Sequence, residues 1–148
     1  MLSADYIVGL TDGEGCFLVS LRKDCRIDLR FFITQAIGNK VLLEKVQQYF
    51  EAGVVYQKSS ARQGKLPSYV FEVTKRDEIY SIIIPFFKTY QLQGTKAHSF
   101  QSFEAISQIV KGRFDTRKLT LEELGLVTQL KLHMNKHYGS LSAGNPLA

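Results

Sequence analysis

The stretch that decides the fold is YIVGLTDGEGCF, residues Tyr6–Phe17. Ser3 stands just before it and can cap a helix, because a serine side chain accepts a hydrogen bond from the first free backbone N–H groups. Apolar residues follow at helical spacing as far as Gly13 and Gly15, and these glycines predict the helix end. From Cys16 onward the residues are typical of a β-strand. The stretch therefore predicts a helix that passes directly into a strand.

Two carboxylates, Asp12 and Glu14, stand at the predicted C-terminal end of this helix. That end carries partial negative charge, so an acid there is unfavourable by roughly 0.3–1 kcal/mol unless a cation compensates it. Magnesium prefers carboxylate and carbonyl oxygens as ligands. Metal ions held there could activate water and stabilise the leaving oxygen of a phosphodiester. The alternative interpretation is a glycine-capped helix end whose acids are merely solvated.

Gly9 and Gly13 lie four residues apart and leave a strip without side chains on one face of the helix. A second helix could approach closely along this strip. Two copies of the helix packed in this way would bring a Glu14 from each to the same place.

Outward from this stretch, the hydrophobic period changes repeatedly between that of strands and that of helices. The strands are predicted in two hairpins, 16–22 with 27–35 and 54–58 with 68–74. Helices are predicted at 39–50, 77–90, 96–111 and 120–134. Pro85 must kink or interrupt the second of these, and a Thr120–Glu123 capping box opens the last. This order predicts an α+β domain with one four-stranded antiparallel sheet.

The composition is that of a globular protein of about one domain, with 148 residues, 45% of them hydrophobic. We expect one domain over residues 1–138 and a disordered tail over 139–148. No apolar run approaches the roughly 18 residues of a membrane span, and no secretory signal opens the chain. Cys16 and Cys25 form no CxxC pair, and the three histidines form no zinc pattern. We therefore expect an intracellular protein without disulfides, membrane contact or a small-molecule cofactor.

The net charge of +5 is concentrated in the two predicted hairpins and their loops, where nine basic side chains stand against three acidic ones. Strand side chains alternate between the two faces of a sheet. One face is then apolar, and the other carries the polar and basic residues. Such a surface fits the major groove of DNA, although a solvated sheet face produces the same pattern.

Residues 7–15, IVGLTDGEG, resemble the motif that names the LAGLIDADG homing endonucleases, with identity at Gly9, Leu10, Asp12 and Gly15. Thr11 is the most polar departure from that motif. Further similarity lies at 32–35, 84–87, 92–96 and 119–135, so the resemblance covers nearly everything from 3 to 135. It implies the α-β-β-α-β-β-α fold of that family, whose four-stranded antiparallel sheet forms a DNA-binding saddle.

The resemblance also implies a catalytic site. Glu14, the last acid of the motif, would bind the catalytic metal with help from the Gly13 carbonyl. Magnesium is the expected ion, with manganese as an alternative. Gln35 and Lys96 match the polar and basic positions around metal-bound water, so Glu14, Gln35 and Lys96 form the expected catalytic set. Two further residues remain candidates near the metal, Gly94 in place of Lys96 and Lys40 as an additional basic neighbour.

The saddle of the family implies DNA contacts on the polar sheet face, here by Ser20, Arg22, Arg26, Asp28, Arg30, Lys58, Ser60, Ser68 and Glu72. Alternation of strand side chains places the same residues on one face. Relatives with one motif copy pair as homodimers, and this chain has one. We therefore expect a homodimer and, from its two-fold symmetry, a near-palindromic double-stranded target. The predicted dimer contact comprises Gly9, Leu10, Asp12 and Gly13.

The expected function is a site-specific homing endonuclease that makes double-strand breaks in a long DNA site by metal-dependent phosphodiester hydrolysis. Two rival functions would keep the basic sheet: an intron-RNA maturase and a non-catalytic, sequence-specific DNA-binding protein. Neither rival needs Glu14, Gly13, Gln35 and Lys96 together. Genes of this family usually lie in mobile introns or free-standing inserts. The expected location is therefore an organelle (chloroplast or mitochondrion) or the cytoplasm of bacteria and phage-infected cells.

Overall fold

The computed structural model describes residues 1–24, 26–59, 64, 66–111 and 119–142, the last eight as backbone only. The helices are α1 (Ala4–Glu14), α2 (Lys40–Phe50), α3 (Arg76–Glu78), α4 (Ile84–Thr89), α5 (Lys96–Val110) and α6 (Leu121–Ser142), with a 3-10 turn η1 (Ile37–Asn39) and a π-helix η2 (Ile79–Ile83). The strands β1 (Gly15–Leu21), β2 (Ile27–Ala36), β3 (Val54–Lys58) and β4 (Ser68–Val73) form one sheet in the order β1-β2-β4-β3. The predicted α+β class with a four-stranded antiparallel sheet is confirmed.

The chain forms two compact units. The first comprises Met1–Phe17 and Arg30–Leu92, and the second comprises Leu18–Leu29 and the chain from Gln93 onward. The single domain expected over residues 1–138 stays a prediction. Among the described residues, no helix has both the length and the apolar character that crossing a membrane requires.

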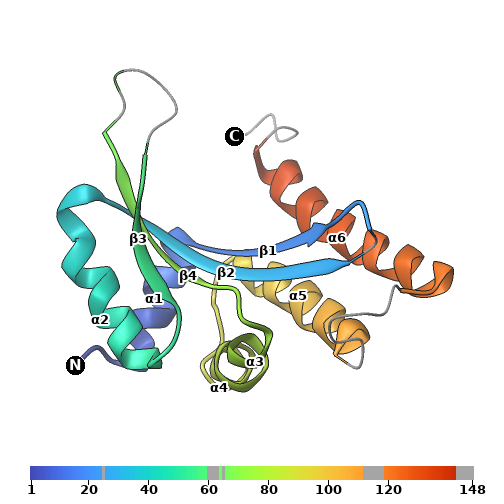
Figure 1. Cartoon of the computed structure of the whole chain (residues 1–148), viewed down its shortest axis with the longest axis horizontal. Helices are drawn as coiled ribbons and strands as arrows, with labels where there is room; N and C mark the ends of the chain where they lie inside the picture. Colours follow the sequence, from blue (N-terminus) through green and yellow to red (C-terminus); the bar gives the residue numbers. More distant parts are fainter. Residues whose placement is uncertain (25, 60–63, 65, 112–118, 143–148) are drawn as a thin grey trace. The chain divides into compact units, whose positions relative to one another are not determined.

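In the first unit, α1 runs directly into β1, as the sequence predicts (Figure 1). The Ser3 side chain accepts a hydrogen bond from the Tyr6 backbone N–H at 3.1 Å and caps the helix. Thr11, the polar departure from the motif, is fully buried, and its hydroxyl donates to the Ile7 carbonyl at 2.8 Å. The polar side chain therefore enters the core with its hydrogen bond satisfied, which removes most of the penalty of burying a hydroxyl.

Gly15 marks the point where helix becomes strand, and the close approach of Thr11 explains why it is glycine. A Cβ added at Gly15 would lie 2.6 Å from the Thr11 Cγ2 and 2.9 Å from the Thr11 carbonyl oxygen. Neither atom belongs to a long flexible side chain that could move aside, so the space for a methyl group is missing.

Replacing Gly15 by alanine is therefore expected to destabilise the fold by about 1–3 kcal/mol, the range for overpacking a closed site. Urea unfolding followed by circular dichroism measures this change. Gly125→Ala is the matched control, because a Cβ at Gly125 in α6 also meets no atom within 4 Å and lies outside the strip of Gly9 and Gly13. The control is expected to leave stability equal or higher, since alanine favours a helix over glycine by up to about 1 kcal/mol. Equal stability of the two variants would contradict the proposed steric role of Gly15.

The core of the first unit is an aromatic cluster on the inner face of the sheet. Phe31 is fully buried and its ring centroid lies 5.1 Å from that of Phe17 and 5.3 Å from that of Phe87. Phe71 of β4 approaches Phe31 edge-on at 6.4 Å. Helix α2 packs on β3 and β4 through buried residues that include Leu43, Val46 and Phe50. This packing fixes which face of the sheet stays outside.

The predicted helix at 77–90 is helical but irregular. It consists of α3, the wider turn η2 and α4, with Pro85 in the first turn of α4. Proline has no N–H to donate to the preceding turn, so a regular α-helix cannot continue through it. The segment stays helical through Pro85, because η2 and α4 follow each other without a gap, and the change expected at Pro85 is one of helix type just before it.

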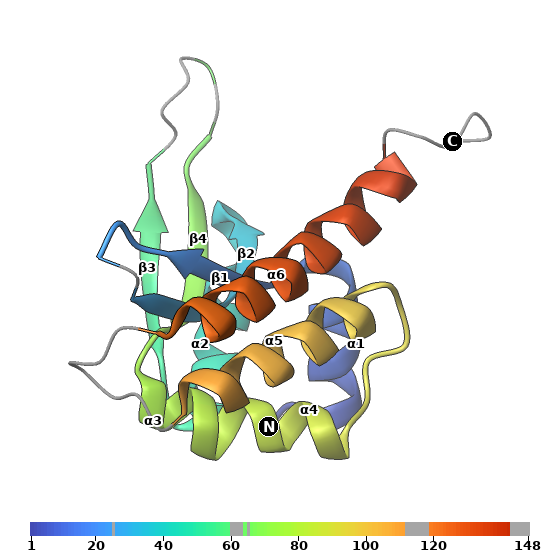
Figure 2. The ribbon, with the colours of Figure 1, turned by 90° about the vertical axis from the view of Figure 1, so that its right-hand side faces the viewer.

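In the second unit, α5 and α6 run side by side (Figure 2). α5 buries Phe100, Phe103 and Ile106, and α6 buries Val127. The predicted capping box is confirmed, because the Glu123 N–H donates to the Thr120 hydroxyl at 3.1 Å and the Thr120 N–H donates to the Glu123 carboxylate at 3.0 Å. α6 continues to Ser142, past the predicted end near 134 and into the predicted tail. Residues 143–148 of that tail lie outside the described residues.

Candidate active site and nucleic-acid interface

Glu14 is the last residue of α1, and its side chain is exposed. Within the part of the chain that the structure describes, its carboxylate makes no hydrogen bond or ion pair. The last carbonyls of a helix have no partner inside the helix, and the Gly15 N–H is bonded to the Thr11 carbonyl. Exposed carboxylate and carbonyl oxygens at the negative end of a helix are the donor types that a hard divalent cation prefers. The residues present therefore fit a magnesium-type ligand set.

Gln35 lies at the same end of the first hairpin as Glu14. Phe17 of β1 contacts Phe31 of β2, and the two strands are neighbours in the sheet. β1 begins one residue after Glu14 and β2 ends one residue after Gln35, so in this antiparallel pair the two residues stand at the same end of the hairpin. The Gln35 Oε1 accepts a hydrogen bond from the Asn39 Nδ2 at 2.8 Å, so its amide is oriented by η1.

Lys40 approaches this same end of β2. Its ammonium lies 5.5 Å from the centroid of the Tyr69 ring and 3.6 Å from the Glu44 Oε1. Tyr69 is the cross-strand partner of Gln35 in β4. The sequence candidate Lys40 is therefore a neighbour of Gln35. Lys96 is the half-buried first residue of α5 and belongs to the second unit, so its place in the catalytic set stays a prediction.

The described residues of the chain do not include a complete set of metal-ligating side chains. Nowhere in that part of the chain do three or more histidine, cysteine, aspartate or glutamate side chains gather. Asp12 is half-buried, one turn from the core residue Val8, and its assignment to the dimer contact is untested.

The exposed face of α1 carries two of the three glycines of the motif, Gly9 and Gly13. A Cβ added at Gly9 or at Gly13 would meet nothing within 4 Å, so contacts inside the chain do not require glycine at either position. Tyr6, one turn earlier, is also exposed, while Leu10 is half-buried. The bare strip that the sequence indicates is present on the surface.

The polar face of the sheet is built as the alternation predicts. The inner residues of β2, such as Ile27 and Leu29, are buried, while Asp28 and Arg30, which alternate with them, are more exposed. Of the nine predicted DNA-contacting residues, eight are exposed or half-buried: Ser20, Arg22, Arg26, Asp28, Arg30, Lys58, Ser68 and Glu72. Ser60 lies outside the described residues.

Two residues that the sequence analysis did not include among the DNA contacts share this polar face. Phe32 of β2 is the cross-strand partner of Glu72, and Tyr56 of β3 is the partner of Val70. Cross-strand partners point to the same side of a sheet. Strand alternation would have found both residues if apolar and aromatic side chains had been counted as candidates for base contact.

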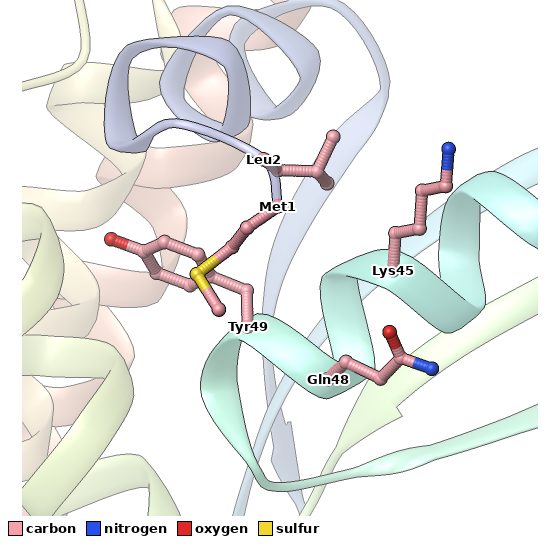
Figure 3. A pocket seen from close by; sticks show the side chains of 5 residues that line it. All are labelled: Met1, Leu2, Lys45, Gln48 and Tyr49. Atoms are coloured by element: carbon pink, nitrogen blue, oxygen red, sulfur yellow. The ribbon is translucent and has the colours of Figure 1, made fainter.

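A pocket of about 310 Å³ opens at the other end of α1, between Met1, Leu2 and the α2 residues Lys45, Gln48 and Tyr49 (Figure 3). An 11-residue helix is about 16 Å long, so this pocket is far from Glu14. It is lined by no carboxylate, and it is not part of the candidate active site.

The structure is thus that of an α+β protein in which a helix ending in an exposed acid enters a four-stranded sheet with one polar face. Residues 7–107 match the family model described as LAGLIDADG endonuclease, and the chain belongs to that family.

Individual relatives agree with this assignment. The chain is 27% identical over 127 residues to probable intron-encoded endonuclease 2 of Neurospora crassa, covering 86% of this chain and 26% of that protein. It resembles the structure of the I-LtrWI LAGLIDADG homing endonuclease bound to target DNA with a TM-score of 0.77 and 32% identity, covering 92% of this chain and 45% of that one. I-SmaMI, bound to uncleaved DNA target in the presence of calcium ions, has the same fold, with a TM-score of 0.80 and 24% identity over 92% of this chain and 46% of that one. The chain thus spans about a quarter of the curated relative and less than half of each solved chain.

Proposed function

We propose that this protein is a metal-dependent, site-specific homing endonuclease that makes double-strand breaks in a long, near-palindromic DNA site. The observation that carries the proposal is Glu14, an exposed acid at the C-terminal end of α1 and at the same end of the first hairpin as Gln35. Family membership supports a catalytic role for Glu14, because the region that matches the LAGLIDADG endonucleases contains both Glu14 and Gln35.

The Glu14 carboxylate and the Gly13 carbonyl would hold a magnesium ion, for which manganese could substitute. Such an ion activates water and stabilises the leaving oxygen of a phosphodiester. The Gln35 amide has its oxygen occupied by Asn39 and keeps its Nε2 donor for a water or a phosphate oxygen. Lys96 completes the proposed catalytic set as a basic group that offsets negative charge on the phosphate.

The polar sheet face would bind the DNA duplex. Its hairpins carry an excess of positive charge, which favours a polyanion. I-LtrWI, the 32% identical relative, was solved bound to target DNA, and this supports DNA as the ligand here.

Two copies of the acid would provide one metal site for each DNA strand, and the given sequence contains one such motif. We propose that a second copy of the chain supplies the other Glu14, joined through the exposed strip of Gly9 and Gly13. The two-fold symmetry of such a dimer gives a near-palindromic target. The Neurospora relative is named as intron-encoded, so we further propose an intracellular role where mobile introns reside, in an organelle or in bacterial or phage-infected cytoplasm.

The test is incubation of the purified protein with a DNA library of candidate insertion sites, in magnesium or in calcium, followed by sequencing of the ends. We expect discrete double-strand cuts at one site in magnesium. Specific binding without cutting in any metal would overturn the enzyme proposal in favour of a DNA-binding regulator. A preference for intron RNA over duplex DNA would favour a maturase.

A further inference from the structure

Three side chains from three different strands meet on the polar face of the sheet. The Tyr56 hydroxyl of β3 donates to the Glu72 Oε2 of β4 at 3.1 Å, and the Arg30 Nη2 of β2 donates to the same oxygen. Strand β4 lies between β2 and β3, so Glu72 stands at the centre of the three. One carboxylate oxygen thus receives two donors from opposite sides.

The strand register explains this meeting. Glu72 is paired with Phe32 on one side and with Val54 on the other. Arg30 and Tyr56 are each two residues from those partners, which places them diagonally across from Glu72. Diagonal neighbours lie roughly 7–8 Å apart at Cα, within reach of long side chains.

Arg30 is also held from a second direction. Its guanidinium carbon lies 5.1 Å from the centroid of the Phe32 ring, an arrangement in which the ring face attracts the cation. The Arg30 side chain is 34% exposed and that of Glu72 is 16% exposed. The arginine is therefore fixed between a ring and a carboxylate while part of it still faces outward.

Tyr56 is the second donor to the Glu72 carboxylate. Partial burial, the hydrogen bond to Glu72 and the negative charge of Glu72 together raise the pKa of Tyr56, against a smaller lowering by Arg30. The phenol therefore stays protonated and remains a donor to Glu72 at neutral pH.

A guanidinium has five N–H donors in a planar fork, and Glu72 engages only one of its nitrogens. The remaining donors match the O6 and N7 acceptors that guanine presents in the major groove. One arginine can donate to both of these acceptors. An arginine that is already fixed loses little conformational freedom on making that contact. Glu72, by contrast, directs its bonded oxygen at the protein.

We infer that Arg30 is a specificity-determining residue that recognises one guanine in the major groove, and that Glu72 is a positioning residue that holds Arg30 for this contact. The inference rests on the proposed function, because it requires DNA on this face of the sheet. Tyr56 and Phe32 complete the support of Arg30. A merely structural ion pair between β2 and β4 would use the same contacts but would read no base.

The experiment is selection of bound sites from a randomised DNA library with the wild-type protein in calcium, repeated with Arg30→Lys and Glu72→Ala. Lysine keeps the charge but cannot donate to O6 and N7 in the bidentate geometry of a guanidinium. We expect both variants to lose preference for guanine at the same base-pair position, by roughly 5- to 150-fold. Preferences elsewhere in the site and the salt dependence of Arg30→Lys binding are expected to stay as in the wild type.

Two further variants separate positioning from structure. Glu72→Gln keeps an oxygen that can accept from Arg30 and Tyr56, so it is expected to retain much of the preference that Glu72→Ala loses. Arg22→Lys is the matched control, because Arg22 meets Asp28 at 3.6 Å with both side chains about half exposed and is not comparably fixed. Any change it causes must fall at a different base pair.

An unchanged profile in Arg30→Lys would overturn the role of Arg30. Equal weakening of Glu72→Ala at every position, or a lower melting temperature with an unchanged profile, would show that Glu72 is only structural. A wild-type protein that selects no DNA sequence would overturn the proposed function and the inference together. A wild-type profile that all four variants leave intact would overturn the inference alone.

Discussion

Glu14→Gln is expected to abolish DNA cleavage while the protein still binds its site and remains as stable as the wild type, or slightly more so. Glutamine keeps the size of the side chain but removes the charge that a hard cation needs. Metal-ion catalysis contributes several kcal/mol to the transition state, so cleavage should fall by about 10³-fold or more.

The same variant is also expected to change the free energy of unfolding. Glu14 is exposed at the negative end of α1, where its charge opposes the helix dipole. Removing that charge is expected to raise the free energy of unfolding by up to about 1 kcal/mol. Thermal unfolding without metal and a cleavage assay in magnesium measure the two effects separately.

Asp5→Asn is the matched control at the opposite end of the same helix. Asp5 is an exposed acid in the first turn of α1, where the helix dipole favours negative charge. This variant should lose a few tenths to about 1 kcal/mol of stability and cleave normally. Wild-type cleavage by Glu14→Gln would exclude Glu14 as the metal ligand.

Gly9→Leu is expected to leave each chain folded but to weaken association of two chains. A side chain at Gly9 meets no atom within 4 Å in the single chain, and leucine favours a helix over glycine by up to about 1 kcal/mol. In a close helix pair the same side chain would have to fit between the two backbones. An overpacking cost of about 1–3 kcal/mol corresponds to association weaker by roughly 5- to 150-fold.

Sedimentation over a range of protein concentrations measures this association, and circular dichroism checks the helices. Gly125→Leu is the control, because Gly125 is also an exposed helical glycine with no atom within 4 Å of an added Cβ, but it lies in α6. The control is expected to associate and cleave like the wild type. A wild-type protein that cleaves both strands as a monomer would contradict the homodimer proposal.

Much of the candidate site could be predicted from local sequence. The helix-to-strand passage at Gly15, the Ser3 cap and the Thr120–Glu123 capping box depend on residues within a few positions of each other. Alternation along β2 gave the outward face of Arg30 without any knowledge of its neighbours. Such features are properties of short segments, so sequence alone is sufficient for them.

The length of α6 and the π-helix before Pro85 could not be predicted in the same way. Helix ends without a clear stop signal depend on what the helix packs against. α6 continues past residue 134 through a segment whose composition favours a loop. The residues of η2, IYSII, contain no glycine or proline that would indicate a wider turn before α4.

What the sequence by itself determined is therefore the motif helix with Glu14 at its end, the order of the elements and the polar side of the sheet, because each follows from periodicity and from neighbouring residues. Tertiary structure alone decided that Arg30 and Tyr56 converge on Glu72. Arg30 and Glu72 are 42 residues apart in the chain, and only the register of β2 against β4 brings them together. Short stretches of sequence do not specify a pairing between residues so far apart in the chain.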